Sequence, residues 1–227
     1  MLKILEKIFP IWINNQLFKV IKSVVINFNK NQSSKIPIYK INSENIKNTR
    51  LVIDREELLK LLPKKGILAE LGVDEGNFSE LILKTCNPNK LYLIDFWGSK
   101  RYNQNKKKDV ENKFKTFIDN GKVEINLGLS TEVVKEFRDN YFDWIYIDTD
   151  HTYETTIKEL EVWKSKVKEN GIIAGHDYIV GNWDGWVRYG VIEAVYEFCS
   201  KYNWEILYLT MEIHNKPSFA IKKIINQ

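Results

Sequence analysis

The stretch FDWIYIDTDHTYETTIKELEVWKSKVKENGIIAGHDY, residues 142–178, decides the fold of this chain. It holds two short apolar runs, residues 142–148 and 171–175, separated by a segment long enough for a helix. Short apolar runs are typical of buried strands, and an intervening helix lets two strands run parallel in one sheet. The stretch therefore predicts a strand, a helix and a second, parallel strand.

The same alternation precedes this stretch. Residues 67–71, 91–95 and 123–127 are apolar runs, each followed by a segment long enough for a helix. Residues 204–209 and 218–224 follow a predicted helix at 188–202 and have no helix between them, so the last strand should be antiparallel. We expect an α/β fold with a Rossmann-like, doubly wound, mainly parallel seven-stranded sheet, a last antiparallel strand and an N-terminal helical extension.

The composition is that of an ordinary globular protein. The 227 residues suffice for one domain and an appendage, and 44% of them are hydrophobic and 28% charged. The net charge is only +4 and the 34 basic residues include five arginines, which argues against a nucleic-acid partner. Cys86 and Cys199 fit no metal motif, so we expect a reduced, cytoplasmic setting.

The first fifty residues differ from the rest. The longest uncharged run, residues 8–18, is shorter than the roughly 20 apolar residues that a spanning helix needs. Apolar residues then repeat at helical spacing between lysines, which predicts an amphipathic helix. They are Leu17, Ile21, Val24, Val25 and Phe28.

Two interpretations of that helix stay open. Its apolar face packs on the main domain or a second subunit, which is the simpler one, or it makes a peripheral contact with a membrane. Residues 29–50 are polar and weakly patterned, as a connector would be. The expected domains are therefore residues 1–50, extension and connector, and residues 51–227, the α/β domain.

A glycine-containing turn follows the first predicted strand of the repeat. In ELGVDEGNFS, residues 70–79, Gly72 and Gly76 allow a tight turn before a helix that begins near Asn77. The spacing is not G-x-G-x-x-G, and Asp74 and Glu75 would repel a pyrophosphate. A dinucleotide ligand is thus disfavoured.

The next two strand ends also carry polar residues. Asp95 is placed to accept hydrogen bonds from both hydroxyls of a ribose, and Phe96 or Trp97 could wall an adenine. Considered alone, Asp95 could equally be a turn or cap residue. Gly128 and Ser130 follow residues 123–127, next to where the base would lie, although both are common turn residues.

Acids and histidines gather after the last two parallel strands. Asp148 and Asp150 follow one strand, and His176 and Asp177 end the next. If the strands are neighbours, Asp148, His176 and Asp177 converge, and two carboxylates with an imidazole make a site for a divalent metal. The alternative is that Asp150 or His151 caps the following helix and that residues 176–177 are a turn.

Three segments resemble a known family. Residues 69–83 (AELGVDEGNFSELIL), 91–97 (LYLIDFW) and above all 142–178 resemble class I S-adenosylmethionine (SAM) dependent methyltransferases. More narrowly, they resemble a group that includes metal-dependent sugar O-methyltransferases and cephalosporin hydroxylase-like proteins. The resemblance covers about residues 52–223.

The resemblance implies a role for each matched residue. Glu70 would contact the methionine end of SAM, with Gly72 and Gly76 shaping the loop beneath it. Asp95 would bind the ribose, and Ser130 falls in the loop beside the adenine. The implied metal ligands are Asp148, His176 and Asp177. Asp150 matches the proposed general base, with His151 its nearest competitor.

One residue departs from the family's pattern. The metal-dependent sugar enzymes carry an acid where this chain has His176. An imidazole ligand weakens the preference of the site for magnesium, which binds oxygen ligands. Manganese, iron and zinc accept an imidazole more readily. It also leaves open a site without metal, in which His176 is itself the base.

These features together predict an O-methyltransferase that acts on a hydroxyl of a sugar or glycan, with SAM and a divalent metal, magnesium or manganese. The metal would lower the pKa of the hydroxyl while Asp150 takes its proton. Two alternatives remain: methylation of a catechol or other small phenol, and a SAM-binding or sugar-binding module without catalysis. We expect a homo-oligomer with a small-molecule or glycan acceptor.

Overall fold

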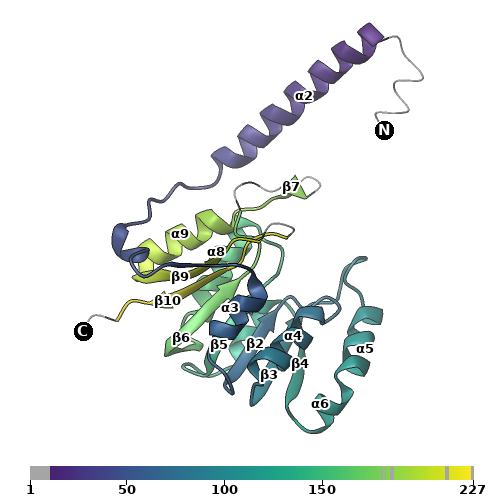
Figure 1. The fold of residues 1–227 in the computed structure, drawn as a ribbon. Helices are drawn as coiled ribbons and strands as arrows, with labels where there is room; N and C mark the ends of the chain where they lie inside the picture. The colour runs from purple at the N-terminus through teal and green to yellow at the C-terminus, as the bar shows by residue number, and fades with distance from the viewer. Residues whose placement is uncertain (1–10, 180, 182, 185–186, 213–214, 226–227) are drawn as a thin grey trace.

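An eight-stranded sheet forms the centre of the protein (Figure 1). The structure is a computed structural model that describes residues 11–179, 181, 183–184, 187–212 and 215–225. The strands of the sheet are β1 Arg50–Val52, β2 Ile67–Leu71, β3 Lys90–Asp95, β4 Val123–Leu127, β5 Phe142–Ile147, β6 Val167–Gly175, β9 Trp204–Thr210 and β10 Phe219–Lys223. A separate hairpin pairs β7 Trp183–Asp184 with β8 Val187–Arg188.

The strand order confirms the predicted fold class. The order is β1-β9-β10-β6-β5-β2-β3-β4, and the strands run parallel except β10, which is antiparallel to both β6 and β9. The chain runs outward from β2 through β3 to β4 and then crosses to β5 on the other side of β2. Open α/β sheets bind ligands at such a switch of direction, outside the carboxyl ends of the strands.

The sheet has one strand more than the seven predicted. The additional strand, β1, forms the edge of the sheet and pairs in parallel with β9. It is only three residues long, and two of them are exposed. A strand so short and exposed leaves no apolar run or alternation in the sequence, which is why the pattern missed it.

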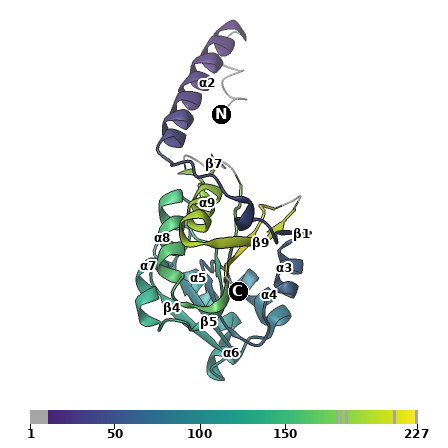
Figure 2. The ribbon, with the colours of Figure 1, turned by 90° about the vertical axis from the view of Figure 1, so that its left-hand side faces the viewer.

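Helices cover both faces of the sheet. They are α3 Arg55–Leu61, α4 Asn77–Cys86, α5 Gln104–Lys113, α6 Lys115–Asp119, α7 Ser130–Val133, α8 Tyr153–Trp163 and α9 Val191–Tyr202, with 3-10 turns at Ser43–Asn45 and Val134–Glu136. Figure 2 shows α7, α8 and α9 on one side of the sheet and α3 and α4 on the other. Successive residues of β5 feed the two cores in turn: Ile145 and Ile147 enter one, Trp144 and Tyr146 the other.

The N-terminal helix α2, Ile11–Ser34, confirms the predicted helix. Residues 1–10 of the predicted extension lie outside the described residues. Both ribbon views show α2 projecting from the body rather than lying along it (Figures 1 and 2). Its C-terminal end touches the hairpin, where Arg188 Nε donates to Ser33 Oγ at 3.0 Å. Among the described residues, no helix has the length and hydropathy needed to cross a membrane.

Candidate active site

A cavity of about 700 Å³ opens at the switch point of the sheet, a size typical of small-molecule sites. Most of the predicted site residues line it. They are Glu70, Gly72, Asp95, Phe96, Ser130, Asp148, Asp150 and His151. Gly76, His176 and Asp177, which are also described, lie outside that lining.

The turn after β2 depends on glycine. Gly72 has φ +85°, and a Cβ there would lie 2.0 Å from the carbonyl oxygen of Asp148. Gly76 has φ +69° and caps α4, where a Cβ would lie 2.6 Å from the ring of Phe114. Both positions therefore require glycine for conformation and for space. At Gly72 the missing Cβ lets the turn approach the end of β5.

Asp95 holds this turn in place. Its Oδ2 accepts hydrogen bonds from the backbone amides of Val73 at 2.7 Å and Asp74 at 3.0 Å. Its Oδ1 accepts from the amide of Trp97 at 3.0 Å, and the buried Trp97 ring donates to the carbonyl of Asp74. Each carboxylate oxygen has two lone pairs, so Asp95 keeps acceptor capacity towards the cavity. This second role of Asp95 left no signal in the sequence.

Glu70 is almost completely buried at the end of β2. Burial raises its pKa to about 8, although the Ser79 hydroxyl donates to Glu70 Oε2 and opposes that shift. Arg55 also lines the cavity and lies 4.8 Å above the ring of Phe78. Arg55 was not predicted as a site residue, because it stands in the first turn of a short helix and belongs to no motif.

Ser130 is connected to a second buried acid. Its hydroxyl donates to Glu159 Oε1, and Thr149 Oγ1 donates to Glu159 Oε2 at 2.9 Å. Burial raises the pKa of Glu159 to about 7, against the effect of these two hydrogen bonds. Glu159 also lines the cavity. It sits one turn before the end of α8, where helical periodicity alone suggests no site residue.

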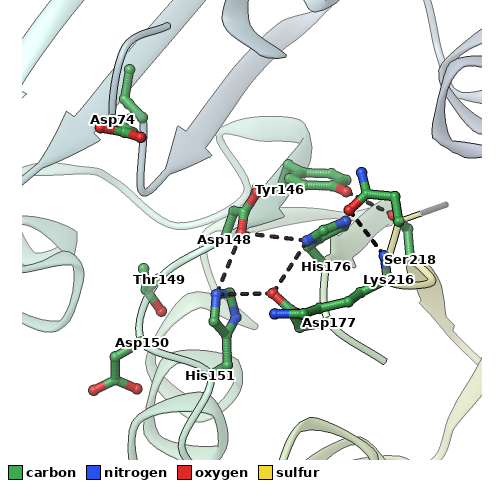
Figure 3. Close-up of polar contacts among 12 residues, drawn as sticks. Asp74, Tyr146, Asp148, Thr149, Asp150, His151, His176, Asp177, Lys216 and Ser218 are labelled. Atoms are coloured by element: carbon green, nitrogen blue, oxygen red, sulfur yellow. Dashed lines mark hydrogen bonds and ion pairs between the residues drawn. The ribbon is translucent and has the colours of Figure 1, made fainter. Parts of the chain in front are cut away.

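The residues predicted to bind metal meet in a ring of four side chains (Figure 3). Because β5 and β6 are adjacent, with Ile147 opposite Gly175, the residues after each strand come together. His151 Nε2 lies 3.6 Å from Asp148 Oδ1 and 3.0 Å from Asp177 Oδ2. His176 Nδ1 lies 3.7 Å and 3.2 Å from the same two oxygens. Carboxylates and imidazoles therefore alternate around the ring.

Burial and charge shift the pKa values in the ring. Burial raises the pKa of Asp148 and lowers that of His151, although the charges of Asp148 and Asp177 oppose the shift of His151. Burial alone would also raise the pKa of Asp177, but the hydrogen bond of His176 and the charges around it bring that pKa down to about 2. One of those charges is Lys216 Nζ, 2.9 Å from Asp177 Oδ1.

The ring has the donor atoms of a cation site. Asp148, His151 and Asp177 each offer one ligand atom, and these atoms lie within 4.8 Å of one another. Behind the ring, His176 Nε2 and Glu212 Oε2 are buried, have no hydrogen-bond partner among the described residues and lie 4.0 Å apart. Glu212 and Lys216 were not predicted, because they follow β9 without a recognisable pattern.

Asp150 takes a different direction. Figure 3 shows its carboxylate pointing away from the ring. Its Oδ1 accepts from the amide and the hydroxyl of Thr152 at 2.9 Å, and its Oδ2 accepts from Thr155 Oγ1 at 2.8 Å. These bonds fasten the turn that leads into α8, but the N-cap of this helix is Thr152, so the predicted cap at Asp150 or His151 was wrong. The role of Asp150 as general base stays a prediction.

The sheet order, the turn after β2 and the cavity at the switch point define the fold of class I SAM-dependent methyltransferases. Three solved structures share it at low sequence identity. The pyocyanin biosynthetic protein PhzM has a TM-score of 0.57 and 10% identity over 74% of this chain and 54% of its own. The B. subtilis M1A22 tRNA methyltransferase TrmK has 0.55 and 11%, over 76% and 67%. A SAM-dependent methyltransferase from Aquifex aeolicus has 0.54 and 16%, over 74% and 89%.

A family match agrees with the fold. A family described as "Methyltransferase domain" matches residues 69–178, the segment that runs from the first site strand to the ring. This match and the fold together support a SAM-dependent methyltransferase domain. The chain spans about half, 54%, of the length of PhzM. A search of curated proteins finds no match.

Proposed function

We propose that this methyltransferase transfers the methyl group of SAM to a hydroxyl of a sugar or glycan, helped by a divalent cation, magnesium or manganese. The observation that carries the proposal is the ring of Asp148, His151, Asp177 and His176, two members of which also line the large cavity. A hydroxyl is a poor nucleophile until it loses its proton. The ring supplies a site for a cation and a group that can take that proton.

The ring fits a divalent cation through Asp148, Asp177 and one of the two imidazoles. We assign His176 as the third ligand, because its Nδ1 lies 3.7 Å from Asp148 Oδ1 and 3.2 Å from Asp177 Oδ2, and because it is buried outside the cavity lining. Mixed oxygen and nitrogen donors favour manganese over magnesium. When bound, the cation would act as a Lewis acid that lowers the pKa of the acceptor hydroxyl.

We assign His151 as the general base. It faces the cavity, and its Nε2 lies between two carboxylate oxygens that would stabilise the imidazolium formed when it accepts a proton. Asp150 is the base that the family resemblance implies. It also lines the cavity, but its carboxylate already accepts hydrogen bonds from Thr152 and Thr155. If His151 is instead a metal ligand, Asp150 regains the role of base.

The acceptor class rests on the same ring. A vicinal diol, as in a sugar, can bind a cation through both oxygens, and so can a catechol. O-methylation of a catechol or other small phenol is therefore the second candidate. A SAM-binding or sugar-binding module without catalysis is the third, although it would have no need of a base and ligand set beside the SAM cavity.

Calorimetric titration with S-adenosylhomocysteine, once with chelator and once with excess manganese or magnesium, tests the first step. We expect micromolar binding in both buffers, followed by metal-dependent methylation when nucleotide sugars and glycans are offered as acceptors. Methylation of catechols alone would favour the second candidate. Binding without turnover of any hydroxyl acceptor would favour the module, and no binding at all would contradict the whole proposal.

The variant Asp148→Ala separates the ring from the SAM site. We expect it to abolish methyl transfer while the affinity for S-adenosylhomocysteine changes by no more than a few-fold, because Asp148 belongs to the cation site. Asp139→Ala, which removes an exposed acid paired with Lys166, is the matched control and should keep full activity. A large loss of S-adenosylhomocysteine binding in Asp148→Ala would move Asp148 into the cofactor pocket.

A further inference from the structure

Helix α2 carries an apolar face and a basic face that the catalytic function does not use. Leu17, Val20, Ile21 and Val24 stand at positions i, i+3, i+4 and i+7 of the helix and share one face. All are exposed, Val24 by 61% and Val20 by 59%. Exposed apolar residues along a projecting helix are unfavourable in water. We therefore expect another surface to pack against this face.

The charge around that face indicates what the surface is. Lys19, Lys22 and Lys30 lie on the opposite side of α2, at spacings that also share one face, and all three are exposed. From Lys7 to Ser43 the sequence has six lysines and no aspartate or glutamate. Two copies of α2 packed through their apolar faces would leave these lysines without a compensating acid. An anionic surface complements the helix instead.

The base of α2 meets the body close to the active site. Arg188 donates to Ser33 at 3.0 Å, to the carbonyl of Tyr189 at 2.8 Å and to Glu193 at 2.5 Å. The ring of Tyr189 in turn lies 4.9 Å from that of His151 in the active site. A docked α2 would therefore hold the catalytic cavity at the surface to which it binds.

We propose that α2 docks on an anionic lipid membrane, with Leu17, Val20, Ile21 and Val24 in the headgroup boundary and the lysines on anionic headgroups. An amphipathic helix with a basic polar face lies in the plane of such a surface without crossing it. Lysines near the surface add electrostatic attraction that salt weakens. This proposal stands apart from the acceptor of the enzyme, since it uses no residue of the cavity.

The test is sedimentation of the full-length protein with vesicles of phosphatidylcholine alone and of equal parts phosphatidylcholine and phosphatidylglycerol. We expect binding to the mixed vesicles, little to phosphatidylcholine alone, and loss of binding at high salt. The double variant Lys19→Gln/Lys22→Gln should weaken binding about tenfold or more. Val20→Gln/Val24→Gln should weaken it by a similar factor, because it removes the apolar contact.

Lys108→Gln/Lys115→Gln is the matched control: it removes the same charge from α5 and α6, far from α2 in Figure 1, and should bind as the parent does. All variants should keep the parent's unfolding midpoint, because α2 projects from the fold. Equal binding by the parent and both α2 variants would overturn the proposal. So would a dimer in solution that Val20→Gln/Val24→Gln dissociates, with no vesicle binding, because a second copy would then cover the face.

Discussion

At the scale of a single residue, we predict that Glu70 links the binding of SAM to pH. Its pKa of about 8 keeps it largely protonated at neutral pH. A ligand that brings an ammonium group to Glu70 favours the ionised carboxylate, so binding below that pKa releases a proton. We therefore expect the affinity for S-adenosylhomocysteine to rise with pH, by at most about tenfold per unit, and to level off above pH about 8. Calorimetry across that range measures it.

Glu70→Gln is the control for this prediction, because the amide has a similar shape and does not titrate. The variant should bind with an affinity that no longer rises with pH in this window. A pH profile unchanged by the substitution would mean that the titrating group lies elsewhere and that Glu70 does not face the amino group of the ligand.

The two candidate general bases, His151 and Asp150, can be distinguished by the turnover of their variants. With His151 as the base, His151→Gln should lower kcat by about 100-fold or more, whereas Asp150→Asn should lose less than about tenfold. Manganese affinity, measured by calorimetry on the same variants, separates base from ligand. A His151→Gln protein that binds manganese as the parent does has lost its base, whereas one that no longer binds manganese has lost a ligand.

At the scale of the elements, the turn after β2 is held by a close approach to the end of β5. Gly72→Ala meets a positive φ and the carbonyl of Asp148 at 2.0 Å, so it should destabilise the fold by about 2–5 kcal/mol. Gly121 has a similar φ of +77° with open space around its missing Cβ. Gly121→Ala should cost only about 1–2 kcal/mol. Urea unfolding compares the two, and equal losses would mean that the turn can shift away from β5.

Helix α8 holds a buried acid that couples its stability to pH. Because the pKa of Glu159 rises from 4.5 to about 7 on folding, the folded protein binds more protons between these values. Stability is then highest below pH about 4.5 and falls towards pH 7, by at most about 1.4 kcal/mol per unit from this group. We expect Glu159→Gln to remove this part of the decline in urea unfolding at several pH values. Glu154→Gln, on the exposed side of the same helix, should leave the decline unchanged.

The elements that sequence could predict are those with a strong periodic signal. The apolar runs of β2, β3, β5 and β6 predicted a site at the carboxyl ends of these strands. A doubly wound sheet binds its ligands there, at the point where the strand order switches direction. The presence of β1 and the direction of Asp150 could not be predicted. Both depend on contacts with distant or exposed neighbours, the strand β9 in one case and the Thr152 and Thr155 hydroxyls in the other. Periodicity carries no information on such contacts.

For the whole molecule, the structure ties part of the expected connector to the α/β body. The buried Asn45 donates from Nδ2 to the carbonyls of Cys199 at 3.2 Å and Trp204 at 2.7 Å. Thr49 Oγ1 donates to the carbonyl of Ile206 at 2.6 Å. These bonds satisfy backbone groups at the end of α9 and along β9. The part of the chain that projects freely therefore ends before Asn45.

Two truncations test where the folded body begins. Removal of residues 1–34 takes away α2 and should leave the unfolding midpoint within about 2 °C, because α2 adds little to either core. Removal of residues 1–49 also deletes Asn45 and Thr49 and leaves buried carbonyls without donors. It should lower the midpoint by roughly 5–10 °C. Asn45→Ala in the full chain should reproduce most of that loss. If both truncations melt alike, the body begins near Arg50, where the polar connector ends in the sequence.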